Sequence, residues 1–304
     1  MYIQKLFSRY YLSRRKGNKN IIMESLCIKT NNQAVINYLL NSIEKFDLDH
    51  VYFCNKQFKI YNNIIIHYLG EQVCEFYNNL ADLLTDCIIQ LYEPILIRKI
   101  VHYNYFYFSS FEKAQIIESC ISLLTQEEEK EFSIRKEHLF IAVLKYASYH
   151  KSIVLDGFVN FRIQDYMKVL DEAIDYSVNK YLIEKEYSEF INLLRLYINS
   201  KDSQMNLIHL IYINSESILL DAQKNIISLT DHIFDAKYLS DISFSSNDYA
   251  LNALLTLLPE VIHVHLIDQE DEFINTLKLI FEDRIKICRD CNICRTYKMI
   301  SSIK

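Results

Sequence analysis

Glycine, proline and tryptophan are scarce in this chain: its 304 residues include three glycines, two prolines and no tryptophan. Gly17, Gly70 and Gly157 lie too far apart to form a glycine-rich phosphate loop or a nucleophile elbow. Such loops need glycine because the backbone must approach a ligand, or turn sharply, without a Cβ. The sequence therefore argues against standard P-loop, Rossmann-fingerprint and α/β-hydrolase chemistries, and we predict no catalytic or cofactor-binding residues of those kinds.

Long apolar runs are also missing. No stretch reaches the 18 or so residues of a membrane span, and the first residues lack the apolar core of a secretory signal. Eight cysteines without such a signal indicate a reducing compartment, in which thiols stay free or bind metal. We therefore expect a cytoplasmic protein that has no membrane partner.

Charge is distributed unevenly along the chain. The net charge is −6, yet residues 1–22 carry six basic side chains and no acidic one. The remaining residues hold 27 basic and 39 acidic side chains, and such an acidic body repels phosphate backbones. A nucleic-acid role would have to depend on residues 1–22 alone, which we interpret as a basic, disordered extension that is dispensable for the fold; whether Met23 is the true start is left open.

Half of the residues are apolar and few are turn formers, which predicts a predominantly helical α+β fold with a sizeable core. Strand-like and helical periodicities divide the chain into a small β-α-β-β unit, a helical domain, a C-terminal α/β unit and a cysteine-containing tail. These parts span residues 23–66, 67–202, 203–287 and 288–304. In the α/β unit, residues 261–267 read as a strand and residues 268–287 as one helix, with Asp268 as its N-cap.

Two central segments leave functional and structural interpretations open. Asp156, Asn160 and Arg162 could form a small polar site beside Gly157, but we favour a structural role in which Gly157 makes a turn into the following helix. The aromatic run of residues 103–108 could stack on nucleic-acid bases, but basic residues are not interleaved with it. We therefore expect this run to be a buried connection between helices.

Three stretches carry a resemblance to a known family. They are IVLDGFVNFRIQDY at residues 153–166, YLIEKEYSEFINLLRLYI at residues 181–198, and DYALNALLTLLPEVIHVHLI at residues 248–267 with FEDRIKICRDCNIC at 281–294. Together they resemble the YtxC-like sporulation proteins of endospore-forming bacteria. The resemblance implies an association with sporulation but supplies no activity and no catalytic residues.

The spacing of Cys288, Cys291 and Cys294 is the most informative local pattern. Thiolates that share one zinc ion lie ~4 Å apart, whereas a regular helix separates residues i and i+6 by ~9 Å along its axis. One helix therefore cannot supply all three ligands unless it unwinds near Cys288. The pattern also matches the first three positions of a ferredoxin run, but Lys298 occupies the fourth. Free thiols, a zinc site, and redox pairing or a cluster all remain open.

A fourth ligand would have to come from elsewhere, and His263 is the candidate. His263 and His265 share one face of the predicted strand, because strand side chains alternate. If the next helix returns antiparallel, the cysteines fall near the start of that strand, beside His263. The remaining cysteines are scattered among apolar residues and are expected in the core: Cys27, Cys54, Cys74, Cys87 and Cys120.

The sequence favours a non-enzymatic interaction or regulatory protein in sporulation, with an unidentified protein partner. The first alternative is a metal-binding or redox protein that uses the cysteine tail, with zinc as the metal to consider. The weaker alternative is nucleic-acid binding through the basic extension, which the acidic body disfavours.

Overall fold

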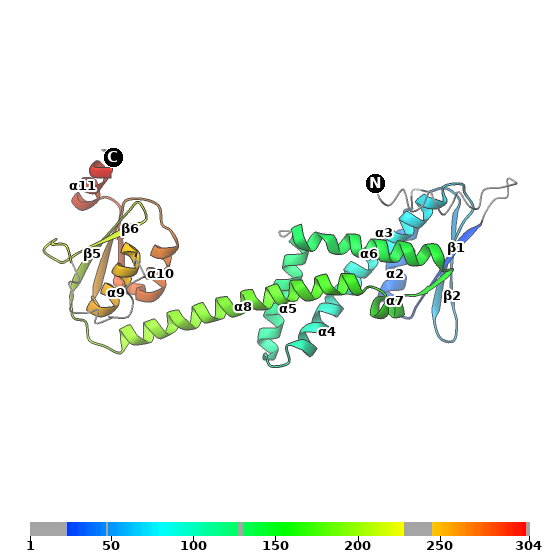
Figure 1. Ribbon diagram of the computed structural model, residues 1–304, viewed down its shortest axis with the longest axis horizontal. Helices are drawn as coiled ribbons and strands as arrows, with labels where there is room; N and C mark the ends of the chain where they lie inside the picture. The colour runs from blue at the N-terminus through cyan, green and yellow to red at the C-terminus, as the bar shows by residue number, and fades with distance from the viewer. Residues whose placement is uncertain (1–22, 47, 127–129, 228–244, 302–304) are drawn as a thin grey trace. The chain divides into compact units, whose positions relative to one another are not determined.

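The computed structural model describes residues 23–46, 48–126, 130–227 and 245–301 (Figure 1). These residues form ten α-helices and two four-stranded mixed sheets, which confirms the prediction of a predominantly helical α+β fold. The chain divides into two compact units, residues 1–182 and 183–304, and the division falls within helix α8 (Gln164–Asn199). The basic extension at residues 1–22 lies outside the described residues. None of the described helices is both long and apolar enough to cross a membrane.

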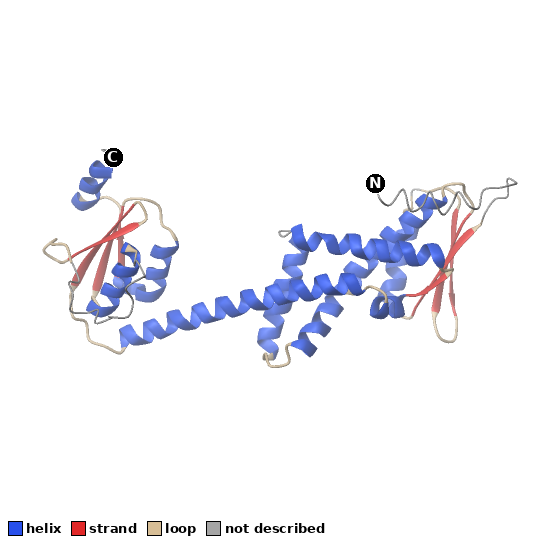
Figure 2. Ribbon diagram, in the orientation of Figure 1, coloured by secondary structure: helices blue, strands red, loops and turns tan. Residues whose placement is uncertain are grey.

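Unit 1 contains the first sheet, in the order β2-β3-β1-β4. Strand β4 runs parallel to β1, and the other neighbours are antiparallel. Alternate residues of β1 are buried, so this sheet presents one apolar face to the helices, whose packing can be followed in Figure 2. The strands are β1 (Glu24–Thr30), β2 (Val51–Gln57), β3 (Asn62–Tyr68) and β4 (Ser152–Val154).

The helices of unit 1 continue the same apolar core, which extends into the first part of α8. Pro94 lies at the start of α4, where its missing N–H removes no intrahelical hydrogen bond, and it marks the break from α3. The helices are α2 (Gln33–Ile43), α3 (Val73–Leu91), α4 (Glu93–Asn104), α5 (Ser110–Gln126), α6 (Lys130–Tyr149) and α7 (Leu155–Phe161). Gly157 lies inside α7, so the predicted turn at this residue is wrong.

A buried polar group joins four helices of unit 1: α4, α5, α6 and the first part of α8. The Glu93 carboxylate accepts hydrogen bonds from Arg135 Nε at 3.1 Å and from the Tyr166 hydroxyl at 2.6 Å. Arg135 also donates to the carbonyl oxygen of Leu124 at 2.8 Å. The Glu93 and Arg135 side chains are each only 9% exposed. Each neutralises the charge of the other, which would be costly to bury alone.

Unit 2 contains the second sheet, in the order β6-β5-β7-β8, in which β5, β7 and β8 run parallel. Apolar side chains on one face of β5 and β7 form its core with α9, α10 and the last turns of α8. The elements are β5 (Leu207–Ile213), β6 (Glu216–Leu220), α9 (Ser246–Leu257), β7 (Val261–Leu266), α10 (Glu272–Phe281), η1 (Glu282–Arg284), β8 (Ile285–Cys288) and α11 (Asn292–Ser301).

The end of unit 2 differs from the predicted single helix over residues 268–287. Helix α10 ends at Phe281, and Glu282 then adopts a positive φ of 46°. A 3-10 turn leads into β8, a fourth strand that the helical periodicity concealed. The N-cap of α10 is Asp271, whose carboxylate accepts from the Ile274 N–H, rather than Asp268.

Candidate metal centre

The parallel direction of β8 brings the cysteines to one end of strand β7. In the register of the two strands, Cys288 pairs with His265 and Lys286 pairs with His263. Directly paired residues point to the same face of a sheet, so Cys288 and His265 share a face. The chain then turns through Cys291 into α11, whose first turn carries Cys294. A strand end, a turn and a helix start therefore supply one thiol each.

These three thiols converge on the imidazole of His265. Cys291 Sγ and Cys294 Sγ lie 3.3 and 3.5 Å from His265 Nδ1. Cys294 Sγ lies 3.7 Å from Cys291 Sγ and 3.9 Å from Cys288 Sγ. All four potential ligand atoms lie within 4.8 Å of one another. Cys294 is fully buried and His265 is 3% exposed, whereas Cys288 and Cys291 are half-buried.

Four of the six distances between these ligand atoms match those between the corners of a tetrahedron around one zinc ion, and the other two are no longer than 4.8 Å. With Zn–S of ~2.3 Å and Zn–N of ~2.0–2.1 Å, tetrahedral geometry places two sulfurs ~3.8 Å apart and a sulfur and a nitrogen ~3.6 Å apart. The four distances above fall within ~0.3 Å of these values. A two-iron cluster would need its ligands on opposite irons to lie farther apart than this. The donor set and its geometry fit a single ion.

The structure places His265, and not His263, beside the cysteines. The sequence argument assumed that the tail returns antiparallel, which would put the cysteines near the start of β7. Because β8 runs parallel to β7, the cysteines reach the later half of β7 instead. The rings of the two histidines are 6.5 Å apart between centroids. Metal binding by Cys288, Cys291 and Cys294 stays a prediction, and His265 replaces His263 as the fourth member of the group.

The surroundings lower the pKa values of His265 and Cys291 and raise the pKa of Cys294. Burial lowers the pKa of His265 to about 4, with a further contribution from His209 and His263, so its imidazole is neutral at pH 7. Burial raises the pKa of Cys294 to about 11, and the neighbouring thiols add to this. Burial also acts to raise the pKa of Cys291, but hydrogen bonds from the Cys294 N–H and nearby groups lower it overall. A bound cation would favour the thiolate form of all three cysteines.

The remaining cysteines are separate from this group. Cys87 and Cys120 are buried in the helical core of unit 1, Cys27 and Cys54 are half-buried, and Cys74 is exposed. The expectation that all five lie in the core therefore holds for only two of them.

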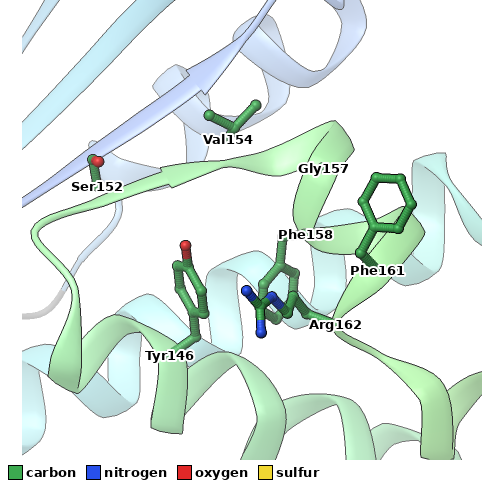
Figure 3. Close-up of a pocket in the computed structure, with 7 residues that line it drawn as sticks. All are labelled: Tyr146, Ser152, Val154, Gly157, Phe158, Phe161 and Arg162. Carbon is green, nitrogen blue, oxygen red and sulfur yellow. The ribbon is translucent and has the colours of Figure 1, made fainter.

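Unit 1 contains an open pocket of about 430 Å³ between β4, α6 and α7 (Figure 3). Its lining residues are Tyr146, Ser152, Val154, Gly157, Phe158, Phe161 and Arg162. The polar site suggested by the sequence is not assembled there. Asp156 accepts from the Tyr92 hydroxyl at 2.8 Å, and Asn160 donates to the Asp156 carbonyl at 2.7 Å. Of these three residues, Arg162 alone lines the pocket, together with the aromatic residues Tyr146, Phe158 and Phe161.

A second feature of unit 1 is a group of exposed aromatic side chains, which we call the aromatic surface. Tyr103, Phe106, Tyr107 and Phe111 are each at least 64% exposed. They surround the connection from α4 to α5, next to a groove of about 450 Å³ whose lining includes Arg98, His102 and Lys113. The prediction of a buried connection is thus wrong for most of the run; within it, Phe108 is buried and Tyr105 packs against the core.

The fold and the cluster together define a two-unit, helix-rich α+β protein with a Cys₃His group in its C-terminal unit. A family model described as the YtxC-like family matches residues 78–286, and the chain belongs to this family. The matched range includes His265 and ends before Cys288. This confirms the resemblance found in the sequence.

Among curated proteins, the uncharacterized protein YtxC of Bacillus subtilis (strain 168) is 21% identical over 136 residues. The alignment covers 43% of this chain and 46% of YtxC, so the chain spans about half the length of the relative that it matches. No solved structure matches the chain.

Proposed function

We propose that this chain is a metal-binding protein whose C-terminal unit is stabilised by one zinc ion held by His265, Cys288, Cys291 and Cys294. The observation that carries the proposal is the convergence of four ligand atoms within 4.8 Å, with four of their six distances close to tetrahedral values. Four protein ligands fill the preferred coordination of zinc and leave no open position for a substrate, which is the pattern of structural zinc sites. The proposed ion ties α11 and β8 to β7.

The test is the zinc content of the full chain purified without chelator. We expect about one zinc ion per chain, because a closed site of three thiolates and one imidazole binds zinc tightly. Replacing all three cysteines by serine should abolish it. The two histidines of β7 provide a matched pair: His265→Ala should lower the zinc content, whereas His263→Ala should leave it unchanged. A metal-free wild-type protein, or an effect of His263→Ala equal to that of His265→Ala, would contradict the proposal.

We also propose that unit 1 binds a partner protein and that the pair acts in sporulation. The family resemblance supports the link to sporulation. The aromatic surface supports the interaction, because contiguous exposed apolar side chains mark binding sites more often than ordinary surface. The adjacent groove is lined by the basic Arg98 and Lys113 and by the acidic Glu118, so its small positive excess favours a segment that carries apolar side chains beside acidic ones.

A complementation experiment tests this role in the host. Deleting the gene should lower the yield of heat-resistant spores with vegetative growth nearly normal, and the wild-type gene should restore the yield. A Phe106→Ser/Phe111→Ser variant should fail to restore it, although its thermal unfolding is unchanged because both side chains are exposed. The matched control is Phe161→Ser, which removes an equally exposed phenylalanine far along the chain from the aromatic surface. Normal spore yield from the double variant would contradict the proposed surface.

A further inference from the structure

His209 lies directly beside the proposed metal ligand His265. In the parallel pair of β5 and β7, His209 is in register with His263, so all three histidines share one face of the sheet. The Nδ1 atom of His209 is 2.9 Å from the Nε2 atom of His265, and the two rings are stacked with centroids 5.1 Å apart. The other nitrogen of His265, Nδ1, faces the thiols.

We propose that His209 is a positioning residue of this centre: it accepts a hydrogen bond from His265 and thereby fixes which nitrogen His265 presents to the metal. The inference rests on the proposed zinc site and adds a residue outside its four ligands. Metal-binding histidines commonly donate their second ring N–H to a carboxylate, a carbonyl or water, which fixes the tautomer and the ring orientation. Here a second imidazole occupies that place.

The proton positions follow from the geometry. A neutral imidazole carries one N–H, and the nitrogen that binds a metal must be the one without it. Since His265 Nδ1 faces the thiols, its proton must be on Nε2, where it points at His209 Nδ1. His209 Nδ1 must then be the acceptor, and the proton of His209 lies on its own Nε2. Both rings are therefore fixed in the same tautomer, with one hydrogen bond between them.

Burial makes this hydrogen bond difficult to replace. His265 is 3% exposed, so water has little access to its Nε2–H if His209 is removed. An N–H left without an acceptor in such a place costs free energy, and the ring can avoid this by moving its proton to Nδ1. That tautomer cannot bind the metal through Nδ1. Loss of the acceptor should therefore weaken metal binding even though all four ligands remain.

Three substitutions in the full chain distinguish a positioning role of the His209 ring from a role in packing alone. His209→Leu keeps a similar volume but removes the acceptor, whereas His209→Asn is smaller but keeps an oxygen close to the position of Nδ1. His263→Leu is the matched control, because it alters the neighbouring histidine on the same sheet face. The measurement is the dissociation constant for zinc, by competition with a chelator at one fixed pH, together with the unfolding of the zinc-free proteins.

We expect His209→Leu to weaken zinc binding ~10–100-fold, which is the usual effect of removing such a partner. His209→Asn should restore most of the affinity, and His263→Leu should change it by less than about threefold. Equal affinities for His209→Leu and wild type would overturn the positioning role while leaving the zinc site intact. Equally weak binding by the leucine and asparagine variants would also overturn it, since the imidazole would then matter only for packing.

A measurement on the wild-type protein does not depend on how the variants fold. In zinc-loaded protein, ¹⁵N NMR of the histidine rings should show His265 with its proton on Nε2 and a metal-bound Nδ1. A proton on Nδ1 of His265, or metal bound through Nε2, would overturn the inference. A wild-type chain that takes up no zinc would refute the proposed function and the role of His209 together.

Discussion

Cys87, Cys120 and Cys294 are all completely buried, but the two units surround them with different groups. In unit 1, burial among apolar helices raises the pKa of Cys87 to about 12 and that of Cys120 to about 11. In unit 2, Cys294 is buried against two other thiols and the nitrogen of His265. Burial alone therefore identifies a cysteine as a small apolar side chain. A candidate metal site is distinguished by the presence of further ligand atoms, here two thiols and one imidazole nitrogen, at coordination distance.

The two units also handle buried charge differently. Unit 1 pairs Glu93 with Arg135, so charge is balanced within the protein. In unit 2 the basic group that interacts with Cys291 is the exposed Arg295, and a divalent cation would hold the three cysteines as thiolates. We expect unit 1 to be stable without any added ion, whereas unit 2 should depend on one.

Zinc removal is the strongest way to test this comparison. A structural zinc site contributes an apparent ~10–16 kcal/mol in small zinc-dependent peptides at pH 7, so its loss should dominate the stability of unit 2. We expect a chelator to lower the unfolding temperature of unit 2 by tens of degrees while leaving that of unit 1 unchanged. Calorimetry with and without chelator measures both transitions. Unaltered melting of both units in the chelator would break the comparison.

A substitution in unit 1 should have the next largest effect. Glu93→Leu leaves Arg135 buried without its carboxylate, and breaking a buried pair in this way typically costs ~3–5 kcal/mol of unfolding free energy. Zinc content should stay the same. The matched control is Asp165→Ala, because its pair with Lys168 is more than 70% exposed and such pairs contribute at most about 1 kcal/mol. Urea unfolding measures the unfolding free energy of both variants. Similar small losses of unfolding free energy would show that the Arg135 side chain becomes solvated when Glu93 is replaced.

Thiol reactivity gives the smallest and most local test. The thiolate is the reactive form, so a raised pKa leaves Cys87 and Cys120 protonated at pH 8 and slow to react. We expect alkylation of both to be at least ~100-fold slower than that of the exposed Cys74. Cys288 and Cys291 are half-buried and should be protected only while metal is present, whereas the buried Cys294 should react slowly in both conditions. Mass spectrometry of alkylated protein, with and without chelator, distinguishes protection by burial from protection by metal; equal reaction of Cys288 and Cys291 in both conditions would argue against metal.

Much of the fold was predictable because apolar periodicity is strong where elements are long. The helical domain expected at residues 67–202 contains the long helix α8, and the strand expected at residues 261–267 is β7. Strand β8 was missed because four residues are too few to display alternation, and they follow a helix without an intervening glycine or proline. The break is made by the positive φ of Glu282, which the sequence does not reveal.

The choice of histidine shows where sequence reasoning ended at the candidate site. The three cysteines were identifiable from their spacing, and both histidines were known to share a face. Selecting between them required the direction of β8, which depends on tertiary pairing with β7. His209 was not identified at all, because it is 56 residues away from His265 along the chain. The signal available for it was a histidine within an otherwise apolar strand.

Three ligands of the proposed centre are close together in the sequence and the fourth is distant, and this difference favours an order of assembly. Cys288, Cys291 and Cys294 are close neighbours, so an unfolded chain could collect them around an ion at small entropic cost. His265 is 26 residues before Cys291 and joins only when β8 pairs with β7. An ion captured early by the thiols would then act as a cross-link that closes this loop. The three cysteines would therefore hold the ion first, and His265 would complete the ligand set when β8 pairs with β7.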